Sequence, residues 1–266
     1  MSTDGRAEDG AEARPDGGRP GGPPGRGARV TVTGLERRLP QGRVLVAAVN
    51  GLTMSAEPGE SVALLGPSGS GKSTALRLIG GLDRPDAGSI QVDDVEVGQL
   101  SGRQAARYRS GIGFVNARAT LLDYLSALDN VIVPVSAARV EFSVRMRARD
   151  LLERVGMGHR AGVMATQLSG SERQRVAIAR AMISRPRLVL ADEPSGGLDS
   201  SSAEEMLGLL ADFHRDYGMT LLLATSESAV ASVCGRVIRL RDGAEVAARA
   251  QGGRPSSRLR PVPRMG

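Results

Sequence analysis

The stretch GPSGSGKST, residues 66–74, holds the only lysine of a chain with 35 lysine and arginine residues. It fits the pattern G-x-x-x-x-G-K-[ST], in which glycines let the backbone curl with its N–H groups turned inward around an anion. Lys72 is expected to reach the β- and γ-phosphates of a nucleoside triphosphate as a compact point charge, which a planar guanidinium would not do in the same cradle. Ser73 is placed to put its hydroxyl on Mg²⁺. The predicted ATP-binding residues are Gly66, Pro67, Ser68, Gly69, Ser70, Gly71, Lys72, Ser73 and Thr74.

A second stretch, RLVLADEPSGGLDS at 187–200, places two carboxylates at the end of an apolar run. Ligands of parallel α/β sheets bind at the carboxyl ends of the strands, so Asp192 and Glu193 are expected to face the phosphates. Asp192 is predicted to hold Mg²⁺ through water, and Glu193 to orient or deprotonate an attacking water as the catalytic residue. An acidic pair at a strand end also occurs without such a role, but that interpretation does not explain the phosphate loop upstream.

The elements that must position these residues alternate between two patterns. SVALLG (61–66), RLVLAD (187–192) and MTLLLAT (219–225) are short apolar runs that predict buried strands, and helical spacing follows the first of them in KSTALRLIGGL. Such alternation predicts an α/β fold with a parallel sheet wrapped by helices. Residues 98–165 are rich in helix formers and predict a mostly helical insertion.

Three segments together resemble one family. GPSGSGKST, then LSGSERQRVAIARAM (168–182), then LADEPSGGLDS stand in the order and spacing of the ATP-binding cassette (ABC) ATPases. The resemblance covers residues 29–248 and is closest to the branch that serves lipoprotein-release and macrolide-export transporters. It implies a P-loop NTPase fold of the ABC nucleotide-binding type, with a mostly parallel core sheet, an N-terminal antiparallel β subdomain and a helical subdomain at about 98–180.

The same resemblance implies that two such domains form a head-to-tail sandwich, as a homodimer or as a heterodimer with another ABC ATPase. Each ATP would then lie between the phosphate loop of one subunit and the signature residues of the other. Those signature residues are Ser169, Gly170, Ser171 and Glu172, and Asp199 corresponds to the D-loop that connects the two sites. Ser169 and Glu172 also form the pattern S-x-x-E, which predicts a capping box at the start of a helix through residue 182.

Several family positions carry other residues here. Leu39 stands where an aromatic normally stacks on adenine, and base stacking on an aromatic is worth ~1–3 kcal/mol in single-stranded nucleic acids, so weaker adenine selectivity is expected. Ala117 replaces the Q-loop glutamine and has no oxygen for Mg²⁺, although Asn116 stands one residue earlier. Ser226 replaces the histidine that touches the γ-phosphate, and Ser171 replaces the second glycine of the usual signature. These substitutions predict slow hydrolysis.

The composition indicates a cellular location and predicts disorder in two terminal segments. The single cysteine, Cys234, cannot form an internal disulfide, no stretch resembles a secretion signal, and the apolar runs are far shorter than the ~20 residues that a membrane-spanning helix needs. A cytoplasmic location is therefore expected, with the protein peripheral on the inner face of the cell membrane. Residues 1–28 and the basic segment 249–266 are predicted to be disordered tails. His159 and His214 are expected to be exposed.

The resulting hypothesis is an ATP-binding subunit that binds MgATP, hydrolyses it slowly and drives a separate membrane permease, with export as the expected direction. The alternative is a degenerate cassette that closes on ATP without hydrolysis and regulates a membrane partner. A nucleic-acid partner is not expected, because the chain carries one cassette and no heptad run. The cargo is not encoded in this chain, because contacts with it belong to the permease.

Overall fold

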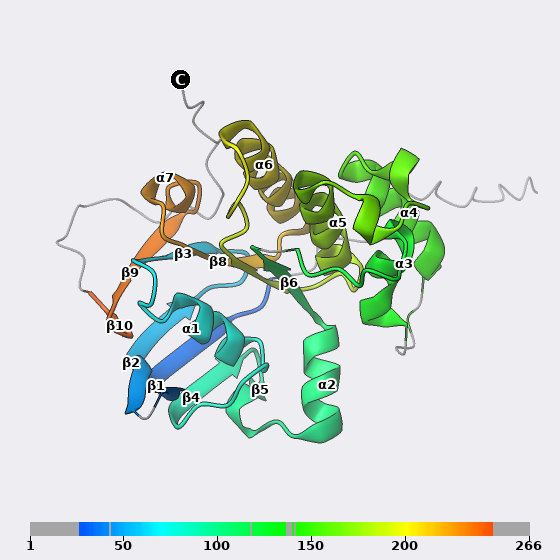
Figure 1. Ribbon diagram of the computed structural model, residues 1–266. Coiled ribbons are helices and arrows are strands. Elements are labelled where there is room, and N and C mark those ends of the chain that lie inside the picture. Colours follow the sequence, from blue (N-terminus) through cyan, green and yellow to red (C-terminus); the bar gives the residue numbers. More distant parts are fainter. Residues whose placement is uncertain (1–26, 43, 118, 137–139, 141, 247–266) are drawn as a thin grey trace, which may run out of the picture.

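The computed structural model describes residues 27–42, 44–117, 119–136, 140 and 142–246. Within them, two sheets and the helices around them form one body (Figure 1). The larger sheet has six strands in the order β10-β9-β3-β8-β7-β6. Its strands are β3 (Ser61–Leu65), β6 (Ile112–Asn116), β7 (Leu188–Asp192), β8 (Thr220–Thr225), β9 (Arg236–Arg241) and β10 (Ala244–Glu245). All neighbours pair in parallel except β9 and β10, so the predicted α/β fold with a mostly parallel sheet is confirmed.

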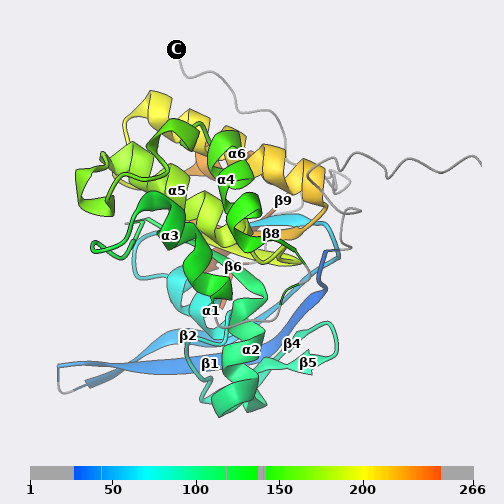
Figure 2. The same cartoon turned by 90° about the vertical axis from the view of Figure 1, so that its right-hand side faces the viewer.

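The second sheet is antiparallel and lies at the N-terminal side of the chain. Its order is β2-β1-β4-β5, with strands β1 (Val30–Gln41), β2 (Val44–Ala56), β4 (Ala87–Val92) and β5 (Val95–Glu96). The hairpin of β1 and β2 extends well beyond the rest of the molecule (Figure 2), and Val44 and Leu45 near its tip are 65% and 67% exposed. The predicted N-terminal antiparallel subdomain is therefore present.

The helices cover both faces of the six-stranded sheet. The longer ones are α1 (Lys72–Ile79), α2 (Gly102–Ser110), α3 (Ala127–Ile132), α4 (Val144–Arg154), α5 (Gly170–Met182), α6 (Ser200–Tyr217) and α7 (Ser228–Ala231), and short 3-10 turns span Val97–Gln99, Val133–Val135, Gly158–Arg160 and Ala165–Gln167. α1 lies between the two sheets, and α3 to α6 lie on the opposite face (Figure 1). No helix in the described part of the chain is long and apolar enough to cross a bilayer.

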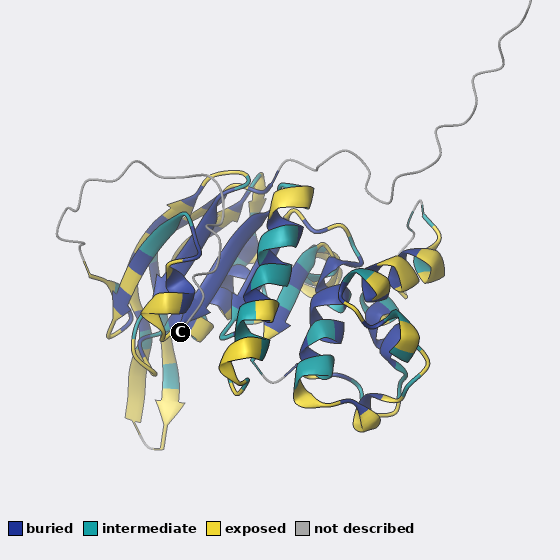
Figure 3. Ribbon diagram, turned by 90° about the horizontal axis from the view of Figure 1, so that it is seen from above, coloured by how far each residue is buried: buried dark blue, intermediate teal, exposed yellow. Residues whose placement is uncertain are grey.

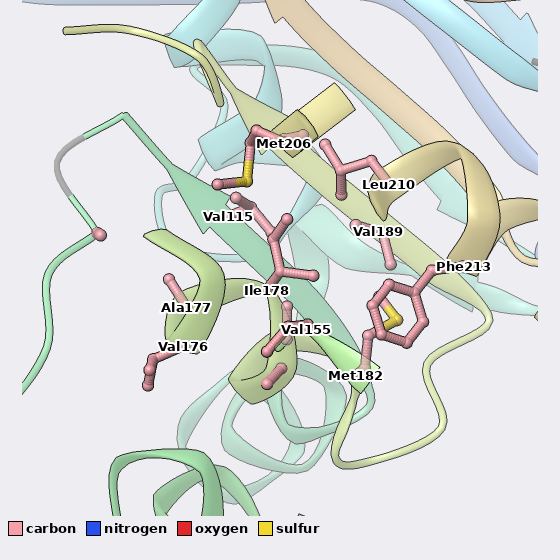
Figure 4. Packing of buried hydrophobic residues seen from close by; sticks show 14 of the residues in the cluster. Val115, Val155, Val176, Ala177, Ile178, Met182, Val189, Met206, Leu210 and Phe213 are labelled. Atoms are coloured by element: carbon pink, nitrogen blue, oxygen red, sulfur yellow. The ribbon is translucent and has the colours of Figure 1, made fainter. Parts of the chain in front are cut away.

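The hydrophobic core has two halves, because alternate residues of the central strands point to opposite faces. In β7, Leu188 and Leu190 pack toward α1, whereas Val189 packs with α5 and α6. The close view of the second half shows Val189, Ile178, Met206 and Phe213 packed together (Figure 4), and the buried strands run through the centre of the molecule (Figure 3). The sheet that carries the two predicted carboxylates is thus buried on both faces.

One strand lies where a helical insertion was predicted. β6 occupies residues 112–116, inside the range 98–165, and pairs in parallel with β7 at the edge of the sheet. The other regular elements of this range are helical, but the sequence did not indicate this strand, because Gly113 weakens the strand pattern of a five-residue run. That glycine serves close packing, since a Cβ at this position would lie 2.8 Å from the carbonyl oxygen of Ala181 in α5.

The predicted N-terminal boundary is also shifted. Most of the two segments that were predicted to be disordered lies outside the described residues, but Gly27 and Ala28 are described. Ala28 is buried, and its N–H donates to the carbonyl of Arg187 at 3.0 Å. A Cβ on Gly27 would lie 2.2 Å from the backbone nitrogen of Gly59, so the chain is already packed against the core at this point.

His214 is buried, which contradicts the expectation that it is exposed. Its side chain lies near the end of α6, is 4% exposed, and places Nε2 3.1 Å from the carbonyl oxygen of Gly59. Burial lowers the pKa of His214 below its ordinary value, because the charged imidazolium loses its hydration. His159, in contrast, is exposed as expected.

We predict that His214 makes stability depend on pH. The unfolded chain binds the proton more readily than the folded chain, so stability is present above the ordinary pKa of histidine, 6.5, and is lost as the pH falls below it. The slope contributed by one such group is at most about 1.4 kcal/mol per pH unit. Urea unfolding of wild type and of His214→Gln between pH 7.5 and 5 checks this as a difference. A His214→Gln variant with the same pH dependence as wild type would contradict the prediction.

Candidate functional site

The segment between β3 and α1 forms an open cradle of backbone. Gly69 and Gly71 have φ values of 81° and 96°, in the left-handed region that favours glycine. Gly71 is the N-cap of α1 and supplies no side-chain cap, so the first N–H groups of the helix remain for a ligand. A helix N-terminus with such groups binds anions, because the N–H groups and the helix dipole both favour negative charge.

The Lys72 side chain folds back onto the backbone of the phosphate loop. Its Nζ donates to the carbonyls of Gly66 at 2.8 Å and Pro67 at 3.0 Å, and the side chain is 5% exposed. Oε1 of Glu193 lies 3.9 Å from the same Nζ. The ammonium therefore stands between the loop carbonyls and the end of β7, where a phosphate would replace the carbonyls as its partner.

Ser73 and Asp192 meet at the same edge of the sheet. The Ser73 hydroxyl donates to Oδ1 of Asp192 at 2.8 Å. Burial raises the pKa of Asp192, the hydrogen bond from Ser73 opposes this, and the neighbouring Glu193 raises the pKa further. A hydroxyl and a carboxylate are oxygen donors of the kind that Mg²⁺ takes. No group of three or more His, Cys, Asp or Glu that could hold a metal occurs among the described residues. The Ser73 hydroxyl and the Asp192 carboxylate nevertheless fit Mg²⁺, because this ion commonly binds one or two protein oxygens together with phosphate and water.

Ser70 gives a second test of fit to a phosphate. Its hydroxyl is buried and has no hydrogen-bond partner among the described residues. An ideal Cβ on Gly66 would lie 2.6 Å from this oxygen, so the hydroxyl lies inside the curl of the loop. A buried hydroxyl without a partner is costly, and a phosphate oxygen in the cradle would satisfy it.

Glu193 has an unusual backbone. Its φ is 45°, which is sparsely populated for a residue with a side chain. The N–H donates to Ala224 in β8 at 2.8 Å and the carbonyl accepts from Gly196 at 2.9 Å, so both neighbours hold the conformation in place. Strain of this kind costs about 1–3 kcal/mol and gathers at functional sites. It turns the Glu193 side chain, 28% exposed, toward Lys72.

The signature segment begins α5 with the predicted capping box, which is confirmed. The Ser169 hydroxyl accepts from the N–H of Glu172, and Oε2 of Glu172 accepts from the N–H of Ser169 at 2.8 Å. That backbone N–H is the main cause of the lowered pKa of Glu172. Ser171 lies alongside, with its Oγ 3.2 Å from that of Ser169, while a Cβ on Gly170 would meet no atom within 4 Å. In the described part of this single chain, no hydrogen bond or ion pair joins the four residues to the phosphate loop.

Asp199 is the N-cap of α6. Its Oδ1 accepts from the N–H of Ser202 at 2.9 Å and its Oδ2 from the Ser202 hydroxyl at 2.8 Å. The backbone hydrogen bond is the main reason why the pKa of Asp199 is lowered. Capping α6 is enough to explain why Asp199 is a carboxylate, without any ligand. Its role as a D-loop residue between two subunits stays a prediction.

Gln174 is a site residue that the sequence did not single out. It lies on the buried face of α5, is 2% exposed, and its Nε2 donates to the carbonyls of Asn116 at 3.1 Å and Pro194 at 2.8 Å. It therefore ties the signature helix to the end of β6 and to the turn after Glu193. The sequence did offer one indication of this role, because Gln174 is an amide residue among the apolar positions of an amphipathic helix. A buried amide needs hydrogen-bond partners in the protein interior.

Three further residues singled out in the sequence, Ala117, Ser226 and Leu39, also have defined places. Ala117 directly follows β6, and a Cβ on Gly196 would lie 3.3 Å from its Cβ, so it borders the turn after Glu193. Ser226 directly follows β8 and is exposed. Leu39 pairs across the hairpin with Val46. None of these three side chains offers an aromatic ring, an amide or an imidazole to a nucleotide.

A separate cavity of about 610 Å³ is lined by residues such as Leu100, Tyr108 and Leu188. It lies at the amino-terminal ends of β6 and β7, whereas Asp192 lies at the carboxyl-terminal end of β7. It is not part of the phosphate site.

Comparison with known proteins decides the family. The family model described as ABC transporter matches residues 49–196, more than half of the chain. The chain belongs to the ABC transporter family. It is an ATP-binding subunit related to the LolD and MacB proteins. The lipoprotein-releasing system ATP-binding protein LolD of Anaeromyxobacter dehalogenans is 43% identical over 221 residues, which cover 82% of this chain and 92% of the relative.

The macrolide export ATP-binding/permease protein MacB of Rhodopseudomonas palustris is 43% identical over 225 residues. The match covers 84% of this ABC chain but 34% of MacB, so the chain spans about a third of the length of that relative. Among solved structures, the dimeric post-hydrolysis state of the ATP-binding cassette MJ0796, bound to ADP and Pi, is 34% identical with a TM-score of 0.76. The match covers 83% of this chain and 99% of that chain.

We predict that Gly71→Ala removes nucleotide binding, because its Cβ would lie 2.2 Å from the carbonyl oxygen of Ala48. Overpacking is expected to cost about 1–3 kcal/mol beyond the strain of a positive φ. Gly34→Ala in β1 is the matched control, because its φ is 55° but its Cβ would meet no atom within 4 Å, and it lies outside the phosphate loop. It should cost only about 1–2 kcal/mol of stability. Thermal unfolding and equilibrium MgATP binding check both, and equal effects of the two variants would contradict the prediction.

Proposed function

We propose that this ABC cassette binds MgATP at residues 66–74 and hydrolyses it to drive a membrane permease. The observation that carries the proposal is the meeting of Lys72, Glu193, Ser73 and Asp192 at one sheet edge, with Nζ 3.9 Å from Oε1 and the hydroxyl 2.8 Å from the carboxylate. A cation, a metal-ligating oxygen pair and a carboxylate base are the groups that phosphoryl transfer to water requires.

In the proposed reaction, the oxygen of a water attacks the γ-phosphorus and the bond to the β–γ bridging oxygen breaks. Glu193 orients that water and accepts its proton, and Lys72 carries the positive charge that the leaving and transferred phosphates face. The backbone N–H groups of the loop hold the phosphates. Mg²⁺ bound near Ser73 and Asp192 would neutralise the charge that develops on the phosphate oxygens.

The signature residues act on a second subunit in this proposal. Ser169 and Gly170 begin α5 at an exposed helix N-terminus, which suits a γ-phosphate presented by another cassette. The dimeric state of MJ0796 supports such a pairing, and a homodimer or a heterodimer with another ABC ATPase fits it. Asp199 would lie between the two sites.

The membrane partner is proposed from the family and from an exposed surface. Tyr124 is 73% exposed and Val133 is 37% exposed, and both flank α3, which follows the segment after β6. We place the contact with the permease at this surface because the ABC family implies it for the segment after β6 and the helical region. We propose a cytoplasmic protein that is peripheral on the inner membrane face, with export as the direction and no nucleic-acid partner.

A second candidate function is an ATP switch that does not hydrolyse. Ala117 favours it, because this residue borders the turn after Glu193 and has no oxygen for Mg²⁺ or water. Ser226 favours it as well, because a hydroxyl reaches less far than an imidazole. Glu193 opposes it, because its strained backbone has no use in a cassette that never activates water.

We predict slow ATP hydrolysis by the purified protein, and a kcat at least about 10²-fold lower for Glu193→Gln, because the general base is lost. MgATP binding should stay within about twofold of wild type, since the variant keeps the shape of the side chain and alters no phosphate contact. Steady-state phosphate release and equilibrium binding measure the two quantities. Equal turnover of both proteins would contradict the role of Glu193, and absent turnover in both would favour the switch.

We also predict that restoring two side chains raises turnover. The double variant Ala117→Gln with Ser226→His supplies an amide and an imidazole near the γ-phosphate, and one preorganised donor is worth roughly 10²–10³ in rate. Phosphate release at saturating MgATP should therefore increase by at least about tenfold. Ser228→His, two residues further along, is the control and should leave kcat unchanged. A double variant as slow as wild type would show that other features limit hydrolysis.

A further inference from the structure

The turn between β9 and β10 lies directly behind the phosphate loop. It consists of Asp242 and Gly243, with φ values of 53° and 81°, between Arg241 and Ala244, which pair across the hairpin. Two consecutive residues of positive φ are typical of a tight two-residue hairpin turn, for which Asp-Gly is a favoured sequence. Asp242 is fully at the surface, whereas Gly243 is buried.

Gly243 makes two backbone hydrogen bonds that join three parts of the chain. Its N–H donates to the carbonyl of Ser70 in the phosphate loop at 3.2 Å, and its carbonyl accepts from the N–H of Asn50 in β2 at 2.8 Å. The antiparallel sheet, the phosphate loop and the C-terminal hairpin therefore meet at one residue. The tight fit excludes a side chain, since a Cβ on Gly243 would lie 2.9 Å from the Asn50 nitrogen and 3.0 Å from Cα of Val49.

The rest of the loop is backed by the same two elements. A Cβ on Gly66 would lie 2.2 Å from the carbonyl oxygen of Leu240 in β9, and a Cβ on Gly71 would lie 2.2 Å from that of Ala48 in β2. The glycines of the loop thus permit close approach of backbone from outside, in addition to the curl that the phosphate needs.

The bond from Gly243 to Ser70 also fixes a donor inside the loop. In a planar trans peptide, the carbonyl of one residue and the N–H of the next point in opposite directions. All described peptide bonds are trans. Because the Ser70 carbonyl is turned outward to Gly243, the N–H of Gly71 is turned inward. No acceptor for that N–H occurs in the described part of the chain.

We propose that Gly243 is a positioning residue for the nucleotide: by holding the Ser70 carbonyl, it aims the Gly71 N–H at the phosphates. The inference rests on the proposed nucleotide site but assigns a role there to a residue far along the sequence from the phosphate loop. It gives the C-terminal hairpin a part in ligand affinity rather than only in closing the sheet.

The test compares MgADP binding by calorimetry for wild type, Gly243→Ala and a matched control, Gly88→Ala. Gly88 has a φ of 83°, and its Cβ would lie 2.4 Å from the carbonyl oxygen of Gly34, but it lies in β4 at the antiparallel sheet. Gly243→Ala should raise the Kd at least about tenfold, as expected for one misdirected hydrogen bond to a charged group, and should raise KM without a change in kcat. Gly88→Ala should lower the Tm and leave the Kd unchanged.

Insertion of one glycine after Gly243 is the second variant, because it moves the N–H away from Ser70 without adding a side chain. It should raise the Kd as Gly243→Ala does, and it serves if Gly243→Ala does not fold. An unchanged Kd in the insertion variant, or an equal rise for Gly88→Ala, would overturn the inference. A wild-type protein that does not bind MgADP would instead defeat the proposed function.

Discussion

A single ammonium group, tied to the backbone of its own loop, organises the functional edge of this protein. Nζ of Lys72 donates to Gly66 and Pro67 and lies 3.9 Å from Glu193, in a position that is almost closed to solvent. A buried charge needs partners, and the loop supplies them before any phosphate arrives. When a triphosphate binds, the Lys72 ammonium would replace these carbonyl partners with negatively charged phosphate oxygens. Hydrogen bonds between charged groups are stronger than those to carbonyls, which would favour binding at this site.

The geometry of that edge is kept by backbone rather than by side chains. The phosphate loop is confined between β9 and β2, and Glu193 is held at a positive φ by hydrogen bonds to β8 and to Gly196. Such positions store strain that the surrounding sheet must offset. The two sheets therefore do more than build a core, since their contact through the C-terminal hairpin sets the shape of the loop between them.

Short-range features of the site were predictable from sequence. The loop at 66–74, the carboxylates at the end of β7 and the capping box at Ser169 are local patterns, and each forms as its residue types require. Features that depend on distant partners were not. β6 is a strand because β7 lies beside it, and Gln174 and His214 are buried because acceptors from other segments reach them. From sequence alone, Gly243 predicts only a hairpin turn, because its hydrogen bond to Ser70 joins segments that are far apart in the chain.

The most direct measurement is equilibrium binding of MgATP to wild type and to Lys72→Arg, which keeps the positive charge and changes only its shape. We expect clear binding by wild type and a loss of at least about 10²-fold in the variant, because a planar guanidinium cannot contact the two carbonyls and the phosphates as a compact ammonium does. Both proteins should show the same far-UV spectrum. Binding by Lys72→Arg as tight as that of wild type, or no binding by wild type, would contradict it.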